Sequence, residues 1–246
     1  MGEPVETSAS GGARSAVLKS CDPRSFDRFA EEYDFAASLE RRPDFFLHHL
    51  PQRRGSVLDV GCGTGILAYE LAQRFASVVA IDISEPMLAI ARTKRAAANI
   101  EYRRADANQL VLGQKFDAIV SHTTFHHLDD VSRTLGVLKT ALTPGGRLIL
   151  VDIIRRWPLI PRHASLSVIK SSLRLLPSTF QYGLRPAWRL FRFYVSGPWL
   201  AHVTTDRYLS VEGFREVYGD LLPGAEFTRL PYFMGVVWQA PGGGET

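Results

Sequence analysis

Short apolar runs alternate with longer amphipathic stretches through the middle of the chain. The apolar runs have the length and composition of buried strands and cover residues 56–60, 78–81, 100–103, 116–121 and 147–153. Between them lie three stretches with the character of amphipathic helices, at residues 66–75, 85–97 and 131–142. Apolar strands that alternate with such helices are typical of a parallel sheet covered on both faces. The pattern therefore predicts an α/β fold.

The segments on either side of this region complete the predicted domain. Phe26, Phe29 and Tyr33 share one face of a predicted helix at residues 22–39, and Pro51 ends a short second helix at residues 43–50. Near the C-terminus, the pattern predicts a helix followed by an antiparallel pair of strands, at residues 206–221, 226–230 and 236–240. We expect one domain over residues 21–246, with cap helices at 22–50, after a disordered tail at 1–20.

Residues 155–205 interrupt the alternation and predict an inserted lid of short helices after the fifth strand. The segment contains prolines at positions 158, 161, 177, 186 and 198 and tryptophans at 157, 188 and 199. Between Asp152 and Asp206 there is no acidic residue and there are eight basic ones, so this segment carries +8 in a chain of net charge +4. The basic lid suggests an anionic substrate or a peripheral contact with an anionic membrane, and a simply solvated face is the alternative.

The amino-acid composition limits where we expect the protein to be located and which kinds of site we expect it to contain. The only cysteines are Cys21 and Cys62, and the sequence has no metal-ligand spacing, so we expect neither a disulfide framework nor a metal site. No apolar run approaches the ~20 residues that cross a bilayer, and residues 1–20 lack the apolar core of a signal peptide. The expected location is therefore the cytoplasm.

A glycine-rich turn follows the first predicted strand. It reads Gly61-Cys62-Gly63-Thr64-Gly65, directly after Asp59-Val60. Such a turn lets a ligand lie against bare backbone at the carboxyl end of a strand. The third glycine comes one position earlier than in dinucleotide sites, and a carboxylate at Asp59 would repel a pyrophosphate but attract an ammonium group. The turn therefore favours an amino-acid-like cation over a nicotinamide dinucleotide.

Two further aspartates follow the second and third strands. Asp82 is placed to accept hydrogen bonds from the hydroxyls of a ribose, and Asp106 from an adenine amino group. Each could instead be an ordinary helix cap or turn residue. Three aspartates at the ends of three successive strands make a nucleoside site the better interpretation.

These residues resemble the motifs of class I S-adenosylmethionine (SAM)-dependent methyltransferases, in particular the subgroup akin to quinone and small-molecule methyltransferases. The resemblance extends over residues 22–153 and includes 57–65, 116–120, His126-His127-Leu128 and 142–148. It implies an enzyme with a Rossmann-like, seven-stranded, mostly parallel sheet whose last strand is antiparallel, SAM as cofactor and S-adenosylhomocysteine as product. The cofactor residues that it implies are Tyr33, Asp59, Gly61, Cys62, Gly63, Gly65, Asp82, Ile83, Met87, Asp106 and Ala107.

Histidines are the candidate catalytic bases, because histidine titrates near neutrality. His122, His126 and His127 follow the fourth predicted strand, at the edge of the predicted SAM site. A buried structural role is the alternative for each of the adjacent pair. In the lid region, His202 and Asp206 have the i, i+4 spacing of a carboxylate-oriented base or of a plain surface pair.

The leading functional hypothesis is a methyltransferase that acts on a small aromatic, apolar or anionic molecule in secondary-metabolite or quinone-like biosynthesis. A nucleic-acid methyltransferase is disfavoured, because residues 121–124 lack the Asn/Asp-Pro-Pro-aromatic loop of enzymes that methylate base amino groups. A SAM-binding fold with other chemistry, such as cyclisation, stays open, since fold does not fix function.

Overall fold

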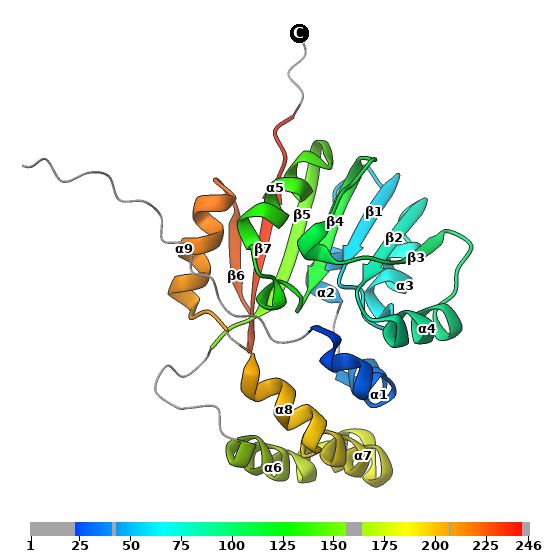
Figure 1. Ribbon diagram of the computed structural model, residues 1–246, viewed down its shortest axis with the longest axis vertical. Helices are drawn as coiled ribbons and strands as arrows, with labels where there is room; N and C mark the ends of the chain where they lie inside the picture. Colours follow the sequence, from blue (N-terminus) through cyan, green and yellow to red (C-terminus); the bar gives the residue numbers. More distant parts are fainter. Residues whose placement is uncertain (1–22, 41–42, 156–163, 207, 243–246) are drawn as a thin grey trace, which may run out of the picture.

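The computed structural model describes residues 23–40, 43–155, 164–206 and 208–242, so the predicted tail lies outside the described residues. Its centre is a seven-stranded sheet in the order β3-β2-β1-β4-β5-β7-β6 (Figure 1). Neighbouring strands among the first five are parallel, and β7 is antiparallel to β5 and β6. The predicted α/β fold and closing antiparallel pair are confirmed. The strands are β1 (Ser56–Val60), β2 (Ser77–Asp82), β3 (Ile100–Arg104), β4 (Phe116–His122), β5 (Leu142–Ile153), β6 (Glu226–Arg229) and β7 (Phe233–Gln239).

Helices cover both faces of the sheet. One buried apolar cluster joins the strands to α5 and α9, and a second joins them to α2, α3 and α4. The α-helices are α1 (Ala30–Glu40), α2 (Asp44–His48), α3 (Ile66–Ala72), α4 (Glu85–Lys94), α5 (Val131–Thr140), α6 (Ala164–Tyr182), α7 (Leu184–Tyr194), α8 (Gly197–Thr205) and α9 (Val211–Leu221), and the 3₁₀ turns are η1 (Pro23–Arg28), η2 (Ala107–Gln109) and η3 (Phe125–His127). Within the described ranges, none of these helices is long and apolar enough to cross a membrane.

Two helices differ from their predicted bounds. The helix expected at 22–39 is divided into η1 and α1, in keeping with the frequent use of 3₁₀ turns at helix N-termini. The helix expected from residue 206 begins at Val211, because the hydroxyl of Ser210 accepts a hydrogen bond from the N–H of Gly213 at 3.0 Å and caps it there. Asp206 is thereby left outside the helix, in a buried polar cluster.

The segment after β5 forms three helices, α6, α7 and α8. They are longer than expected, because Pro177 lies inside the 19-residue α6, while Pro186 and Pro198 lie in the first turns of α7 and α8, where a missing N–H is tolerated. These helices pack on the N-terminal segment through Phe29, Leu190 and neighbouring rings. In Figure 1, α1 and α8 lie between the sheet and the α6–α7 pair. Their function as a lid stays a prediction.

Candidate active site

The glycine turn joins β1 to α3 with three backbones in the left-handed region. Gly61, Gly63 and Gly65 have φ angles of 72°, 54° and 82°. A Cβ at Gly61 would lie 2.1 Å from Oγ1 of Thr124, so a side chain does not fit there. A Cβ at Gly63 would meet no protein atom within 4 Å. The turn therefore presents bare backbone to open space, which fits the predicted approach of a ligand.

A pocket of about 680 Å³, open solvent at its mouth included, lies beside this turn at the carboxyl ends of the strands. Phe26 and His127 also line it. The predicted cofactor residues that the pocket brings together are Tyr33, Gly61, Gly63, Asp82, Ile83, Met87, Asp106 and Ala107.

Three predicted cofactor residues lie outside the pocket lining. Asp59 and Cys62 are each 1% exposed, beneath the turn. Gly65 faces the ring of Tyr102, whose hydroxyl oxygen would lie 2.6 Å from an added Cβ. Cys62 and Gly65 belong to the turn itself, and direct contact with a cofactor stays a prediction for all three residues.

The two other predicted acids combine a local role with a place in the pocket wall. Asp82 accepts hydrogen bonds from the N–H groups of Gly63 at 2.8 Å and Ser84 at 2.9 Å. Asp106 caps η2 by accepting from the N–H of Asn108 at 2.9 Å. A carboxylate offers about four acceptor positions, so these bonds leave capacity for ligand hydroxyl or amino groups.

The N-terminal segment is attached firmly over the pocket. Asp27 accepts a hydrogen bond from the hydroxyl of Ser84 at 2.5 Å, and Asp34 lies 2.9 Å from Nζ of Lys94 and 2.6 Å from Nη1 of Arg95. Burial would raise the pKa of Asp34, but the hydrogen bonds from Lys94 and its other partners outweigh burial and lower it. These contacts hold the aromatic residues of η1 and α1 at the pocket.

His126 is oriented by the carboxylate of Asp152, which lies 26 residues later in the chain. Its Nδ1 lies 2.6 Å from Oδ1 of Asp152, and its backbone N–H donates to Oδ2 of the same residue at 2.8 Å. Both side chains are 6% exposed. An Nδ1–H bonded to a carboxylate places the lone pair of the imidazole on Nε2, which is the tautomer that a general base needs.

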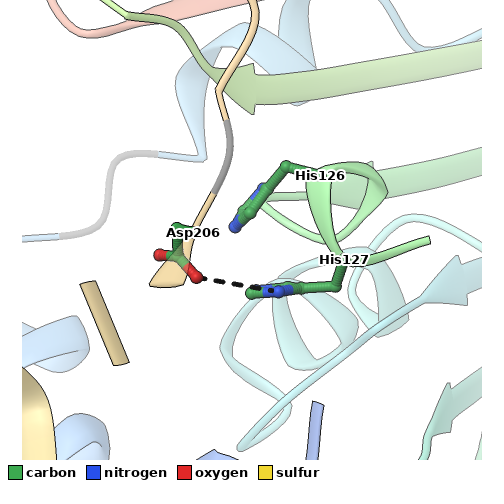
Figure 2. Close-up of side chains that lie close together, drawn as sticks. All are labelled: His126, His127 and Asp206. Carbon is green, nitrogen blue, oxygen red and sulfur yellow. Dashed lines mark ion pairs between the residues drawn. The ribbon is translucent and has the colours of Figure 1, made fainter. Parts of the chain in front are cut away.

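His127 is a neutral neighbour of this pair. Its ring centroid lies 3.9 Å from that of His126, and its Nδ1 lies 4.0 Å from Oδ1 of Asp206 (Figure 2). Burial, with a further contribution from His126, lowers the pKa of His127 to about 3. His127 is therefore uncharged at neutral pH, and its contact with Asp206 is one between a neutral imidazole and a carboxylate.

The same three residues could hold a metal ion. One ligand atom each from His126, His127 and Asp206 lies within 4.8 Å of the others, and Figure 2 shows the three side chains facing one another. Ligands bound to one zinc ion at about 2.0–2.2 Å lie roughly 3.5 Å apart, so the side chains would have to move together to close such a site. The absence of a metal site stays a prediction.

The remaining histidines have different surroundings. His122, at the end of β4, lines the pocket and lies between the rings of Phe46 and Phe233, each 5.6 Å away. His202 is 4% exposed, with Nδ1 2.9 Å from the hydroxyl of Ser25 and Nε2 3.6 Å from Asp206. The i, i+4 pair of His202 and Asp206 is thus a buried pair and not the surface pair that was the alternative.

Sequence reasoning missed two residues of this site. Asp152 was seen only as the boundary of the basic segment, although its position at the carboxyl end of β5, beside β4, could have indicated it. The other is Tyr208, whose hydroxyl donates a hydrogen bond to Asp206 at 2.6 Å and whose position in the sequence matched no motif.

Known proteins share both this sequence and this fold. A family described as methyltransferase domain matches residues 58–150. An uncharacterized methyltransferase of Mycobacterium bovis is 34% identical over 190 residues, which are 75% of this chain and 87% of that protein. The demethylmenaquinone methyltransferase of Thermus thermophilus is 37% identical over 142 residues, 52% of this chain and 63% of that protein. The solved complex of DhpI with S-adenosylhomocysteine (SAH) has the same fold, with a TM-score of 0.59 at 18% identity over 94% of this chain and 99% of that one.

The chain therefore belongs to the class I SAM-dependent methyltransferases. The predicted fold and the prediction of an enzyme are confirmed, and SAM is the cofactor of this family, as expected. The acceptor and the residues that act on it are the subject of a proposal.

Proposed function

We propose that the protein transfers the methyl group of SAM to a hydroxyl or phenol oxygen of a small aromatic or apolar acceptor, with His126 as the general base. The contact of 2.6 Å between His126 and Asp152 carries this proposal. A base is needed where the nucleophile must lose a proton as it attacks, and this requirement favours oxygen acceptors over carbon or amine centres that are already nucleophilic.

The cofactor site consists of the glycine turn and the pocket walls. Asp82 would accept hydrogen bonds from the ribose hydroxyls, Asp106 would face the adenine edge, and Met87 and Ile83 would pack on the adenine ring. The backbone of Gly61 and Gly63 would leave room for the methionine portion, which Tyr33 would cover. When bound, SAM supplies an electrophilic methyl group on a positively charged sulfur. The fit of the bare glycine backbone and the flanking carboxylates to a cationic nucleoside supports this assignment.

The acceptor side lies where η1, η3 and α8 meet. The ring of Phe26 is 5.7 Å from that of His127 and 4.5 Å from that of His202, and Trp199 lies 5.5 Å from His202. A flat aromatic ring packs well against such walls. The name of the Thermus relative, a demethylmenaquinone methyltransferase, is consistent with a quinone-like acceptor.

The proton moves along the histidine–aspartate pair. Nε2 of His126 would take the proton of the acceptor hydroxyl, so that its oxygen could accept the methyl group that bound SAM would supply, with SAH as the leaving group. Asp152 stabilises the imidazolium that forms and fixes its orientation. His127, which stays neutral, can form a hydrogen bond with the acceptor without taking up its proton. Alignment of the reacting groups supplies a large part of the rate, about 7–11 kcal/mol in well-oriented reactions.

The proposal is tested by incubating the protein with methyl-labelled SAM and a panel of phenols, quinols, alcohols and amines. We expect labelled product, with SAH released in equal amount, from one or more oxygen acceptors. Label on amines alone would contradict the assignment of oxygen. Tight binding of SAM without transfer to any acceptor, or turnover that persists with SAH in place of SAM, would instead favour a SAM-binding protein with other chemistry.

Replacement of Asp82 tests the cofactor site separately. Asp82→Asn keeps the shape of the side chain but loses the charge-assisted bonds, worth roughly 1.5–3 kcal/mol each, so the affinity for SAM should fall at least about tenfold. Calorimetric titration with SAM and SAH measures this loss. Asp129→Asn, at an exposed position outside the pocket, is the matched control and should bind like the parent protein. Equal affinities in the two variants would contradict the proposed ribose contact.

A further inference from the structure

Helix α6 exposes a stripe of large apolar side chains. Ile169, Leu173, Leu176 and Phe180 are between 54% and 85% exposed. They lie at positions i, i+4, i+7 and i+11, which at about 100° per residue fall within roughly 60° of one another around the helix axis. The side chains therefore form one continuous apolar face, in contrast to the scattered exposed leucines of an ordinary surface.

Helix α7 exposes two further large apolar side chains. Gly183 joins the two helices, and Phe180 and Leu184 flank it. Leu184 is 70% exposed, and Trp188, one turn later, is 51% exposed. In Figure 1, α6 and α7 lie at the lower end of the view, beyond α1 and α8. Extended apolar surface of this kind marks a contact with a partner or a membrane.

Arginines line a groove on α7. Arg185, Arg189 and Arg192 of α7 line a groove together with Trp188 and Arg28. Arg189 pairs with Glu32 at 2.9 Å, whereas Arg185 and Arg192 make no ion pair within the parts of the chain that the structure describes. No acidic residue follows Asp152 in the sequence until Asp206. The charged side chains of α6 and α7 are thus all basic, and Glu32 of α1 offsets one of the arginines in the groove.

We propose that the α6–α7 face docks on an anionic lipid surface. The stripe enters the boundary between headgroups and acyl chains, Trp188 lies at that boundary, and Arg185 and Arg192 pair with lipid phosphates. The charge of this face favours an anionic lipid surface over a second copy of the chain. Two copies joined through this face would bring two basic segments together, and these would repel each other. The docking surface is separate from the active site and does not depend on the proposed acceptor.

Flotation with vesicles tests the proposal. The full chain is mixed with vesicles of phosphatidylcholine alone or of phosphatidylcholine with phosphatidylglycerol. We expect the bound fraction to correspond to at least about tenfold tighter association with the anionic vesicles, and added salt to weaken it. Binding to neither kind of vesicle would overturn the proposal.

Two double variants separate the apolar and the charged contributions. Leu173→Gln/Phe180→Gln should reduce binding about tenfold or more, while Val111→Gln/Tyr232→Gln, which changes two other exposed apolar residues, should not. Arg185→Gln/Arg192→Gln should remove most of the preference for anionic lipid, and Arg133→Gln/Arg215→Gln, at exposed positions on α5 and α9, should retain it.

Other outcomes identify other occupants. A parent protein that is dimeric by light scattering, and that becomes monomeric in Leu173→Gln/Phe180→Gln, would assign the face to a second copy. Calorimetric binding of inorganic phosphate without vesicle binding would assign the groove to a soluble anion. SAM affinity is measured in the same preparations and should be unchanged, so loss of docking is distinguished from failure of the proposed function.

Discussion

Replacement of His126 by glutamine should lower kcat for the acceptor found in the transfer screen by about 10²–10⁴-fold, the usual contribution of a general base. Glutamine fills a similar volume but cannot take up the proton of the acceptor. Because His126 is outside the lining of the cofactor pocket, the affinity for SAM should change little. Steady-state kinetics and calorimetric titration of the same preparations measure the two quantities.

Three variants sharpen this experiment. Asp152→Asn should also lower kcat, because it removes the charge that stabilises the imidazolium and can favour the wrong tautomer. His126→Gly should regain part of the lost rate when imidazole is added to the assay, an effect that a merely structural role would not produce. His48→Gln, at an exposed position on α2, is the control and should retain the parent rate. Unchanged kcat in His126→Gln would overturn the assignment.

The same assay distinguishes a base from a metal ligand. If His126 acts as a base, the rate should persist after treatment with a chelator. Loss of the rate on chelation, with recovery when zinc is returned, would assign His126, His127 and Asp206 to a metal site, since their ligand atoms already lie within 4.8 Å of one another.

Most of the predicted cofactor residues gather at one pocket because nearly all of them lie at or near the end of a strand. The glycine turn follows β1, Asp82 is the last residue of β2, and Asp106 lies two residues after β3. Parallel strands bring their carboxyl ends to one edge of the sheet. Gly61, Gly63 and Gly65 have positive φ angles, which a residue with a Cβ adopts only at a cost. The three glycines alone therefore indicate such a turn in the sequence.

The acceptor side could be predicted only in part because its contacts are long-range. His126 and Asp152 are 26 residues apart, and they meet because β4 and β5 are neighbours in a register that pairs His122 with Val151. Ser25 meets His202 across 177 residues. Neither the packing of η1 on α8 nor the burial of Asp206 follows from periodicity, which fixes the face of a helix but not its partner.

The basic segment at residues 155–205 shows a second limit of prediction from sequence alone. Its charge and prolines indicated a departure from the alternating fold, but proline positions were interpreted as breaks although Pro177 lies inside α6. The helical spacing of its apolar residues was visible, whereas the exposure of that face was not, because a hydrophobic stripe usually packs against a core. Only the tertiary arrangement distinguishes a buried stripe from a docking surface.

The burial of His127 should make stability depend on pH. Its pKa in the folded protein is lowered to about 3 by desolvation, with His126 contributing, from an ordinary value of 6.5. Between these values the unfolded chain binds the proton and the folded protein does not, so the unfolded state is favoured as pH falls. The contribution of neutral His127 to stability is therefore fully present above about pH 6.5 and is lost progressively toward pH 3.

Between about pH 7.5 and about pH 5, this linkage should reduce the free energy of unfolding by about 2 kcal/mol. Other groups titrate in the same range, so the test compares variants. Denaturant unfolding of His127→Gln, which cannot titrate, should show a pH-dependent loss smaller than that of the parent by about this amount. His48→Gln removes an exposed imidazole and should keep the parent's slope. Parallel pH curves for the parent and His127→Gln would mean that His127 takes up its proton as readily in the folded protein as in the unfolded chain, and that acceptors therefore meet a charged imidazolium at mildly acidic pH.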